Sequence, residues 1–294
     1  MKLGLGTAQF GSRYGVTNAL GQVQPEAARA MMRFALENGI DLFDTGPAYG
    51  TAEQLMGSVL PTAAKIVTKT RITRRPSFSS DDIAEVRTSF LDSLGALRRT
   101  DIYGLLVHSP DDLLRPGGDL IVELLLELRD RGAVQKVGVS VLRREHIEYC
   151  LRRYPLDLYQ IPMNYLDQRI VRSGLLRDLQ DSGAEIHARS IFLQGILLAQ
   201  PDDLPEYFSP WRDKLAMIRS ELAAAGAAPS AAGIAFVRSR TPASYAIVGA
   251  TSIAEMQQLL QQSSAAAAGL RFDDFAIDDE ALIDPWRWPA FGTS

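Results

Sequence analysis

The sequence has very little of what builds disulfides or metal centres. Cys150 is the only cysteine among 294 residues, so no disulfide can form within the chain. The three histidines, His108, His146 and His187, lie too far apart to show the spacing of zinc ligands. We therefore expect no metal site. Cys150 falls inside a helical pattern and is expected to be a small buried hydrophobe.

The sequence also lacks an excess of charge and a long apolar run. Its formal net charge is -4, and no lysine-rich run offers a basic face to nucleic acid or anionic lipid. No apolar run approaches the roughly 20 residues of a membrane-spanning helix, and the segment MKLGLGTAQF has no signal-peptide pattern. We expect a cytoplasmic protein that binds small molecules and neither nucleic acid nor membranes. The sequence leaves its oligomeric state open.

What the sequence does have is a regular alternation of short, β-rich apolar runs with longer amphipathic segments. The predicted strands are 3–6, 40–43, 65–68, 102–107, 136–139, 158–161, 185–188 and 245–248. The clearest predicted helices between them are 25–38, 80–97, 119–131 and 143–153. Eight such units predict a closed parallel (β/α)8 TIM barrel with its active site at the C-terminal ends of the strands. A doubly wound open sheet is the main alternative, but no G-x-G-x-x-G turn follows the first strand.

No segment has the composition of a linker between domains, so we expect residues 1–294 to form a single barrel domain. The Ala, Gly and Pro-rich segment 223–232 interrupts the later helical region without indicating a boundary. The tail from Leu270 is rich in Asp and aromatic residues, including Trp286 and Trp288. We expect this tail to fold over the barrel mouth and to shape the substrate pocket.

Ionisable side chains follow three consecutive predicted strands. Asp44 ends GIDLFD, Lys69 follows KIVT, His108 follows DIYGLLV, and Tyr49 begins the loop after Asp44. In a (β/α)8 barrel these positions meet at one rim. A cation beside a phenol favours loss of the phenolic proton, so Lys69 next to Tyr49 would suit proton transfer.

Each of these residues also has a simpler interpretation. Asp44 could be a turn or N-cap residue, Lys69 a solvated charge at a strand end, and His108 a partner for a loop carbonyl. His146 and His187 are expected to be structural. The four polar residues taken together favour a catalytic site.

The runs GIDLFDTGPAYGTAEQLMG, VTKT, LLVHSPDD, GAVQKVGVS and AIVGATS resemble the aldo-keto reductase family in order and spacing, over nearly the whole chain. This resemblance implies hydride transfer from a nicotinamide cofactor, usually NADPH, to the carbon of an aldehyde or ketone. It implies that Tyr49 protonates the carbonyl oxygen and that Lys69, paired with Asp44, tunes Tyr49. His108 then orients the carbonyl.

The resemblance also implies a cofactor site. Ser140 and Gln160 fall where the family binds the nicotinamide carboxamide, although Val141 stands where many members have Asn. The run ARSIFLQGILL matches the loop along the pyrophosphate, with Ile191 where Pro is common. The implied cofactor-binding residues are Gly6, Thr7, Asp44, Ser140, Gln160, Arg189, Ser190, Phe192, Gln194, Gly195, Val248, Gly249, Ala250, Thr251, Ser252 and Glu255.

The choice between NADPH and NADH depends on the residues at the start of the last long helix. Thr251 and Ser252 open that helix, whose free N–H groups and dipole would suit the extra phosphate of NADPH. No Lys or Arg lies within 249–262, so Arg238 and Arg240 are considered as substitutes. Glu255 falls where an adenine contact is common. We expect NADPH, with NADH possible.

Three functions are compatible with the sequence. The favoured one is NAD(P)H-dependent reduction of an aldehyde or ketone, with a sugar-derived or small aldehyde as the substrate and with polar groups such as Arg13, Asn18, Asn164 and Asp167 near the loops. The second is a cofactor-binding regulatory protein with little turnover. The third is a barrel isomerase that uses Lys69 as a Schiff base, which requires a lysine that is not paired to Asp44. The predicted pocket walls are Phe10, Tyr14, Tyr165 and Phe192, with Trp211 or the tail.

Overall fold

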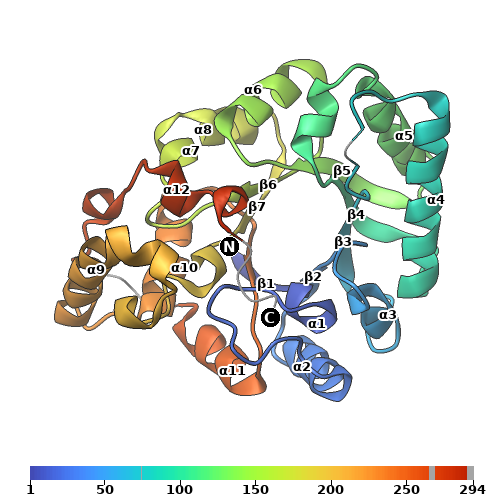
Figure 1. Cartoon of the computed structure of the whole chain (residues 1–294). Coiled ribbons are helices and arrows are strands. Elements are labelled where there is room, and N and C mark those ends of the chain that lie inside the picture. Colours follow the sequence, from blue (N-terminus) through green and yellow to red (C-terminus); the bar gives the residue numbers. More distant parts are fainter. Residues whose placement is uncertain (74, 265–268, 290–294) are drawn as a thin grey trace.

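The computed structural model describes residues 1–73, 75–264 and 269–289, and its centre is a closed barrel of eight parallel strands in the order β1 to β8 (Figure 1). The strands are β1 (Lys2–Gly6), β2 (Leu42–Asp44), β3 (Lys65–Lys69), β4 (Ile102–Val107), β5 (Val134–Ser140), β6 (Leu158–Pro162), β7 (Glu185–Arg189) and β8 (Tyr245–Val248). Pairing of β1 with β8, for example Leu3 with Ala246, closes the ring. The predicted (β/α)8 barrel is confirmed, and the open-sheet alternative is wrong.

The helices lie outside the barrel and follow local sequence signals (Figure 1). α2 (Pro25–Glu37) begins with a proline, which lacks the N–H that a helix start leaves unpaired. α4 (Ser80–Leu97) begins with a capping box, in which Ser79 Oγ accepts the Asp82 N–H and the Asp82 carboxylate accepts the Ser79 N–H. α5 (Asp119–Asp130) and α6 (Arg144–Arg153) each start and end within one residue of the prediction.

The remaining helical elements lie between the strands and after β8. They are α1 (Ala8–Gly11), α3 (Ala52–Gly57), α7 (Arg169–Arg172), α8 (Leu175–Asp181), α9 (Arg212–Ala224), α10 (Pro229–Arg240), α11 (Ile253–Gln262), α12 (Glu280–Ile283) and the 3-10 turns η1 (Pro110–Leu114), η2 (Leu193–Gly195), η3 (Pro201–Asp203), η4 (Glu206–Trp211), η5 (Phe272–Phe275) and η6 (Pro285–Arg287). The Ala, Gly and Pro-rich segment separates α9 from α10, as predicted. In the described part of the chain, no single helix has the length and apolarity to cross a membrane. One bent pair of helices, Glu206–Ala224 with Pro229–Arg240, together reaches the length and apolarity of a membrane span, by length and composition only.

The apolar core has two parts. The larger part lies between the barrel and its helices and includes fully buried Phe43, Phe90 and Cys150, so the prediction for Cys150 is confirmed. The smaller part fills the barrel interior and consists of Leu42, Val67, Leu106, Leu158, Tyr245 and Ile247. Side chains that alternate between these two parts along each strand hold the strand ends in fixed positions.

The N-terminal end of the barrel is filled by a cluster of ionisable and aromatic side chains. Lys65 Nζ donates to the Tyr245 hydroxyl at 2.9 Å, and the Tyr103 hydroxyl donates to Glu185 Oε2 at 2.7 Å. His187 Nε2 lies 2.7 Å from Glu185 Oε1, which gives His187 a structural role as predicted. We call this set the floor cluster; its members are Asp41, Lys65, Tyr103, Lys136, Glu185, His187 and Tyr245. Ligands therefore have access from the opposite end.

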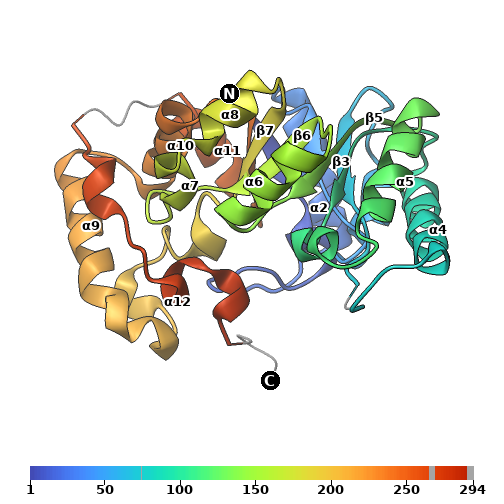
Figure 2. The ribbon, with the colours of Figure 1, turned by 90° about the horizontal axis from the view of Figure 1, so that it is seen from above.

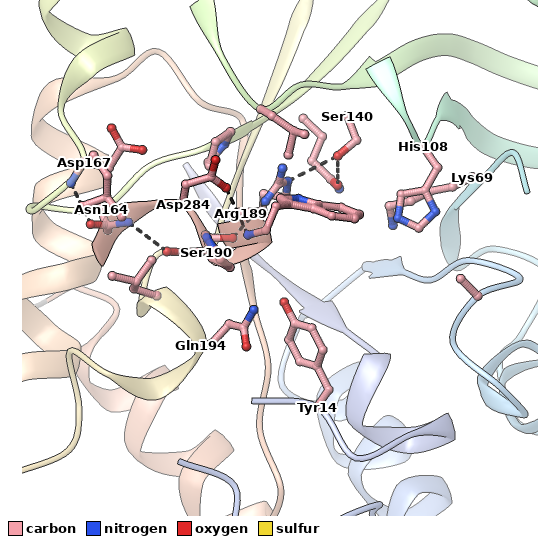
Figure 3. A pocket seen from close by; sticks show the side chains of 18 of the residues that line it. Tyr14, Lys69, His108, Ser140, Asn164, Asp167, Arg189, Ser190, Gln194 and Asp284 are labelled. Carbon is pink, nitrogen blue, oxygen red and sulfur yellow. Dashed lines mark hydrogen bonds between the residues drawn. The ribbon is translucent and has the colours of Figure 1, made fainter. Parts of the chain in front are cut away.

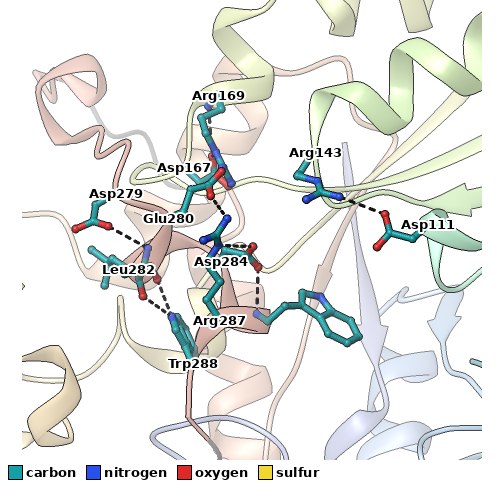
Figure 4. Close-up of polar contacts among 12 residues, drawn as sticks. Asp111, Arg143, Asp167, Arg169, Asp279, Glu280, Leu282, Asp284, Arg287 and Trp288 are labelled. Atoms are coloured by element: carbon teal, nitrogen blue, oxygen red, sulfur yellow. Dashed lines mark hydrogen bonds and ion pairs between the residues drawn. The ribbon is translucent and has the colours of Figure 1, made fainter. Parts of the chain in front are cut away.

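The tail covers part of that opposite end. In Figure 2 the N-terminus and α12 lie at opposite ends of the barrel. Arg169, in α7, joins the tail to the loop after β6, because it donates to Asp167 Oδ1 at 2.9 Å and to Glu280 Oε1 at 3.0 Å (Figure 4). Arg287 also pairs with Glu280, and Trp288 Nε1 donates to the Leu282 carbonyl at 3.1 Å. The prediction that the tail folds over the barrel mouth is correct.

Candidate active site

Asp44 and Lys69 meet at the ends of β2 and β3. Lys69 Nζ donates to Asp44 Oδ1 at 2.9 Å, to Asp44 Oδ2 at 2.8 Å and to the Thr45 carbonyl at 2.6 Å. Both side chains are buried. A lysine with three such acceptors is not a solvated charge at a strand end. The pairing also opposes the Schiff-base alternative, which needs an unprotonated amine.

Tyr49 lies directly beside this pair. Lys69 Nζ is 4.9 Å from the centre of the Tyr49 ring, and the His108 ring meets the Tyr49 ring edge-on, with 6.0 Å between ring centres. The loop that carries Tyr49 is held by two glycines. A Cβ on Gly11 would lie 1.6 Å from the Tyr49 carbonyl oxygen, and Gly50 has φ +56° and faces Gly11.

The charge states in this site follow from burial and from neighbouring charges. Burial alone would lower the pKa of Lys69, but Asp44 and Tyr49 outweigh it, so the pKa lies above its ordinary value. Burial, with Lys69 and Arg189, lowers the pKa of His108 to about 3, and its buried Nδ1 has no hydrogen-bond partner among the residues that the structure describes. Lys69 is therefore charged and His108 neutral at physiological pH.

Tyr14 reaches the same space from the loop after β1. About 40% of this residue is exposed, while its hydroxyl points into the pocket (Figure 3). Burial of that end and the nearby Tyr49 raise the pKa of Tyr14 to about 12. Tyr14 thus keeps its proton and is available as a hydrogen-bond donor.

A chain of hydrogen bonds extends from Asp44 across the strand ends. Gln160 Nε2 donates to Asp44 Oδ1 at 2.6 Å, and Ser140 Oγ donates to Gln160 Oε1 at 3.2 Å. Arg189 Nε in turn donates to Ser140 Oγ at 3.3 Å. Four strands, β2, β5, β6 and β7, therefore contribute to one polar network at the barrel mouth.

Two cavities open at this network. The inner pocket, of about 340 Å³, is lined by Tyr14, Ala48, Tyr49, Lys69, Ile72, His108, Ser140, Leu142, Gln160, Pro162, Asn164, Asp167, Arg169, Arg189, Ser190, Leu193, Gln194, Ile283, Asp284, Pro285 and Trp286 (Figure 3). The long groove, of about 680 Å³, runs from Asp44 past Gly195 to Thr251 and Glu255. Tyr14, Tyr49, Gln160, Arg189, Ser190 and Gln194 line both. A small pocket with ionisable groups thus joins a groove long enough for an extended ligand.

The barrel and this rim agree with a comparison to known families, because the sequence model of the Aldo/keto reductase family matches residues 2–276. The chain belongs to this family. Membership implies oxidoreduction of carbonyl compounds, and members generally use a nicotinamide cofactor. The resemblance inferred from the sequence motifs is confirmed.

Two curated relatives are similar in sequence. Aldo-keto reductase YhdN of Bacillus subtilis (strain 168) is 29% identical over 184 residues, covering 59% of this chain and 53% of YhdN. The match therefore spans about half the length of that relative. L-galactose dehydrogenase of Arabidopsis thaliana is 23% identical, covering 98% of this chain and 93% of that protein.

Solved structures share the fold. The holo form of aldo-keto reductase AKR11C1 from Bacillus halodurans has a TM-score of 0.73 at 22% identity, covering 93% of this chain and 90% of that chain. Glycerol dehydrogenase AKR11B4 from Gluconobacter oxydans has a TM-score of 0.68 at 20% identity, covering 98% of this chain and 93% of that chain. At these identities the likeness supports the (β/α)8 barrel alone.

Most residues predicted to bind a cofactor line one of the two cavities. The long groove includes Gly6, Thr7, Asp44, Phe192, Gly195, Gly249, Ala250, Thr251 and Glu255 as well as the shared Gln160, Arg189, Ser190 and Gln194, and the inner pocket includes Ser140. Val248 and Ser252 line neither cavity. Val248 is buried in β8, and Ser252 Oγ instead accepts the Glu255 N–H at the start of α11.

Several predicted neighbours of the site lie elsewhere. Phe10 is fully buried in the core, Tyr165 packs between Phe272 and Phe275, and Trp211 Nε1 donates to Asp279. None of these three aromatic residues lines either cavity, so their predicted role as pocket walls is wrong. Tyr14, Phe192 and Trp286 of the tail do line the cavities.

The prediction that Arg238 and Arg240 substitute for a basic cofactor ligand is also wrong. Arg238 donates to the Ser263 carbonyl beyond the C-terminal end of α11, and Arg240 Nη2 donates to Asp273 at 3.0 Å. Thr251 and Ser252 lie at the other end of α11. Neither arginine therefore substitutes for a basic residue at the start of this helix.

Two features of the site were not predicted from the sequence. Buried Glu53 accepts a 2.6 Å hydrogen bond from Thr68 Oγ1 beside Lys69, and burial raises the Glu53 pKa. Near the groove, the Val16 N–H donates to the Gln194 carbonyl at 3.1 Å, so the loop after β1 bridges to the loop after β7. For the first feature the only signal in the sequence is the acidic residue Glu53 in GTAEQLMG. For the second it is Gly15, which adopts a positive φ in the loop after β1.

Proposed function

We propose that the protein is an NAD(P)H-dependent oxidoreductase that reduces an aldehyde or ketone to the alcohol, with Tyr49 as the proton donor. One observation carries this proposal. The Lys69 ammonium, fixed by Asp44 and the Thr45 carbonyl, lies beside the Tyr49 ring at the inner pocket, and neutral His108 meets the same ring edge-on.

The proposed roles follow from charge. Reduction places negative charge on the carbonyl oxygen, and Tyr49 gives its proton to that oxygen. Lys69 stabilises the phenolate that remains, and Asp44 holds the ammonium in position. Neutral His108 donates a hydrogen bond to the same oxygen without adding a charge to the pocket. A bound nicotinamide would supply the hydride.

The long groove has the features that a dinucleotide requires. Gly195, with φ +95°, and Gly249 lie in its wall, where their neighbours leave no room for a Cβ. A Cβ on Gly249 would lie 2.7 Å from the Gln9 side chain. Ser140 and Gln160 would hold the carboxamide at the inner end, and the loop from Ser190 to Gly195 would lie along the pyrophosphate.

The outer end of the groove favours NADH over the NADPH expected from the sequence. Glu255 Oε2 accepts the Thr251 N–H at 2.8 Å, and Glu255 Oε1 accepts the Thr251 hydroxyl at 2.9 Å. This carboxylate occupies the helix N-terminus that a phosphate would use, and it would repel a phosphate there. A ribose hydroxyl could instead donate to Glu255.

The proposed substrate is a polar, sugar-derived or small aldehyde. Asn164 and Asp167 line the inner pocket, and Asn18 lines the long groove. One curated relative is named for a sugar, L-galactose. Action in the cytoplasm remains part of this proposal.

The test is oxidation of NADH and NADPH by wild-type and Tyr49→Phe protein with sugar-like, short aliphatic and aryl aldehydes. We expect wild-type turnover with at least one class and a loss of about 100-fold to 10,000-fold in Tyr49→Phe, because a general acid is removed. Cofactor fluorescence should show nearly unchanged binding in the variant.

Two outcomes would contradict the proposal. Equal turnover by both proteins would remove Tyr49 as the proton donor. Cofactor binding without turnover across all aldehyde classes would favour a regulatory protein.

A further inference from the structure

Arg189, the last residue of β7, is the only cation among the described residues that lines both cavities. It is partly buried. Figure 3 shows it at the centre of the pocket, among Ser140, Ser190 and Asp284. Since Tyr49 also lines both cavities, the guanidinium borders the space in which the carbonyl would react.

All the hydrogen bonds of Arg189 go to neutral acceptors. Its Nε donates to Ser140 Oγ at 3.3 Å, Nη1 to Ser190 Oγ at 3.0 Å and Nη2 to the Val141 carbonyl at 2.8 Å. A guanidinium has five N–H groups. Two of them thus have no acceptor within the described part of the chain, on a side chain whose position is fixed by three contacts.

Other charged groups of the inner pocket are already paired. Lys69 is paired with Asp44, and Arg169 with both Asp167 and Glu280. The pocket carboxylate Asp284 lies 3.5 Å from Arg287 Nε and accepts the Trp286 N–H.

Arg189 differs from these groups. It forms no ion pair with any residue in 1–73, 75–264 or 269–289, and the charges of Asp44 and Asp284 act on it only at longer range. Burial lowers the pKa of Arg189, which shows that the site is poorly solvated for a cation. A partly desolvated guanidinium with free N–H groups is a binding site for a carboxylate or phosphate.

We propose that Arg189 binds an anionic group on the substrate, so that the protein acts on carbonyl compounds that carry a carboxylate or phosphate. This inference rests on the proposed function, because it takes Tyr49 and His108 as the groups that meet the carbonyl. A sugar acid or a sugar phosphate with an aldehyde group has this chemistry. The pyrophosphate of the cofactor is the other source of an anion, because Arg189 also lines the long groove.

The test compares two substrates that differ in charge, 4-carboxybenzaldehyde and its neutral ester, methyl 4-formylbenzoate. D-glucuronate and D-glucose form a second pair of sugar type. We expect wild-type protein to prefer the acid in kcat/KM by at least about 10-fold, since a charge-assisted hydrogen bond contributes about this much. Arg189→Met should reduce the ratio of acid to ester by about 10-fold to 100-fold, mainly through the KM of the acid. Arg189→Lys should retain part of the preference.

Arg240→Met is the control. It removes a cation that lines neither cavity and is paired with Asp273. The ratio of acid to ester should therefore stay near the wild-type value in this variant. The same ratio in wild type and Arg189→Met would overturn the proposal.

Cofactor binding separates the two sources of the anion. If Arg189 binds the pyrophosphate, Arg189→Met raises the Kd of NADH and NADPH without changing the ratio of acid to ester, and the proposal is wrong.

If wild-type protein reduces no aldehyde, the proposed function fails, and a second experiment is needed to test the anion site by itself. Thermal stabilisation of the cofactor-bound protein by 4-methylbenzoate then tests Arg189 directly. Stabilisation lost only in Arg189→Met supports the anion site, and no stabilisation of wild type overturns it.

Discussion

At the scale of single residues, the position of Tyr49 depends on a contact between backbone atoms. There is no room for a Cβ on Gly11 in α1 against the Tyr49 carbonyl, and Gly50, the next residue after Tyr49, lies against the Gly11 carbonyl. Nothing in the side chain of Tyr49 specifies this arrangement. A substitution outside the inner pocket should therefore affect the proposed proton transfer.

We predict that Gly11→Ala lowers kcat by about 100-fold, because a shift of about 1 Å in a reacting group can have this effect. It should also lower the free energy of unfolding by about 1 to 3 kcal/mol through overpacking. Steady-state kinetics and urea denaturation measure the two effects separately. The control is Gly95→Ala in α4, where an added Cβ meets nothing within 4 Å. Wild-type kcat in Gly11→Ala would mean that the loop adapts without moving Tyr49.

The sequence predicted these residues to different degrees. Asp44, Lys69 and His108 could be found because each follows an apolar run whose end in a barrel is known. Arg189 was predicted only as a cofactor ligand, since its lack of an ion pair depends on where distant carboxylates lie. Phe10 was misjudged because residue type does not show which face of a short helix is buried.

At the scale of elements, backbone N–H groups at the N-terminus of α11 are already hydrogen-bonded to side chains of the same turn. Ser252 caps the Glu255 N–H, while the Glu255 carboxylate takes the N–H and hydroxyl of Thr251. A helix start usually attracts anions, and here the chain itself provides one. The proposed preference for NADH over NADPH depends on this turn.

We predict that Glu255→Gln lowers the Kd of NADPH by about 10-fold and changes the Kd of NADH much less, because a repulsive charge near the phosphate is removed. Titration of cofactor fluorescence measures both constants. Asp203→Asn is the control, since Asp203 is another carboxylate of the long groove. Equal changes for both cofactors in Glu255→Gln would contradict this account.

The eight strands and the four helices that were predicted with bounds match the structure to within two residues at each end. The strands 102–107 and 245–248 and the helix 80–97 match β4, β8 and α4 in full. The turn at Glu255 was not predicted, because a hydrogen bond between a side chain and a backbone N–H four residues away has several alternatives in an isolated sequence.

At the scale of the whole molecule, the two ends of the barrel have different chemistry. At the mouth, Arg189 has no ion pair with any described residue, whereas the floor cluster pairs its charges. Burial alone would raise the pKa of Glu185, but hydrogen bonds from His187, Lys136 and Tyr103 outweigh it and lower the pKa to about 2. That the whole chain forms one domain stays a prediction.

The floor cluster should make stability depend on acid pH. The pKa of Glu185 is lower in the folded protein than in the unfolded chain, so its stabilisation is present above pH 4.5 and is lost between about pH 4.5 and 2. We predict that Glu185→Gln lowers the free energy of unfolding by about 1 to 3 kcal/mol at pH 7 and much less near pH 2. Urea denaturation at several pH values measures this difference. Glu221→Gln on α9 is the control, and a constant difference at all pH values would contradict the assignment.

The bridge between the loops after β1 and β7 has a consequence for the time course of the proposed reaction. The Val16 N–H bonds to the Gln194 carbonyl, and Gly195 lies so close to Thr17 that a Cβ would come within 1.9 Å of its hydroxyl oxygen. A cofactor bound beneath these loops, as proposed for the long groove, would leave after the two backbones separate. Loop opening would then be a step of every cofactor exchange, and turnover would not exceed its rate.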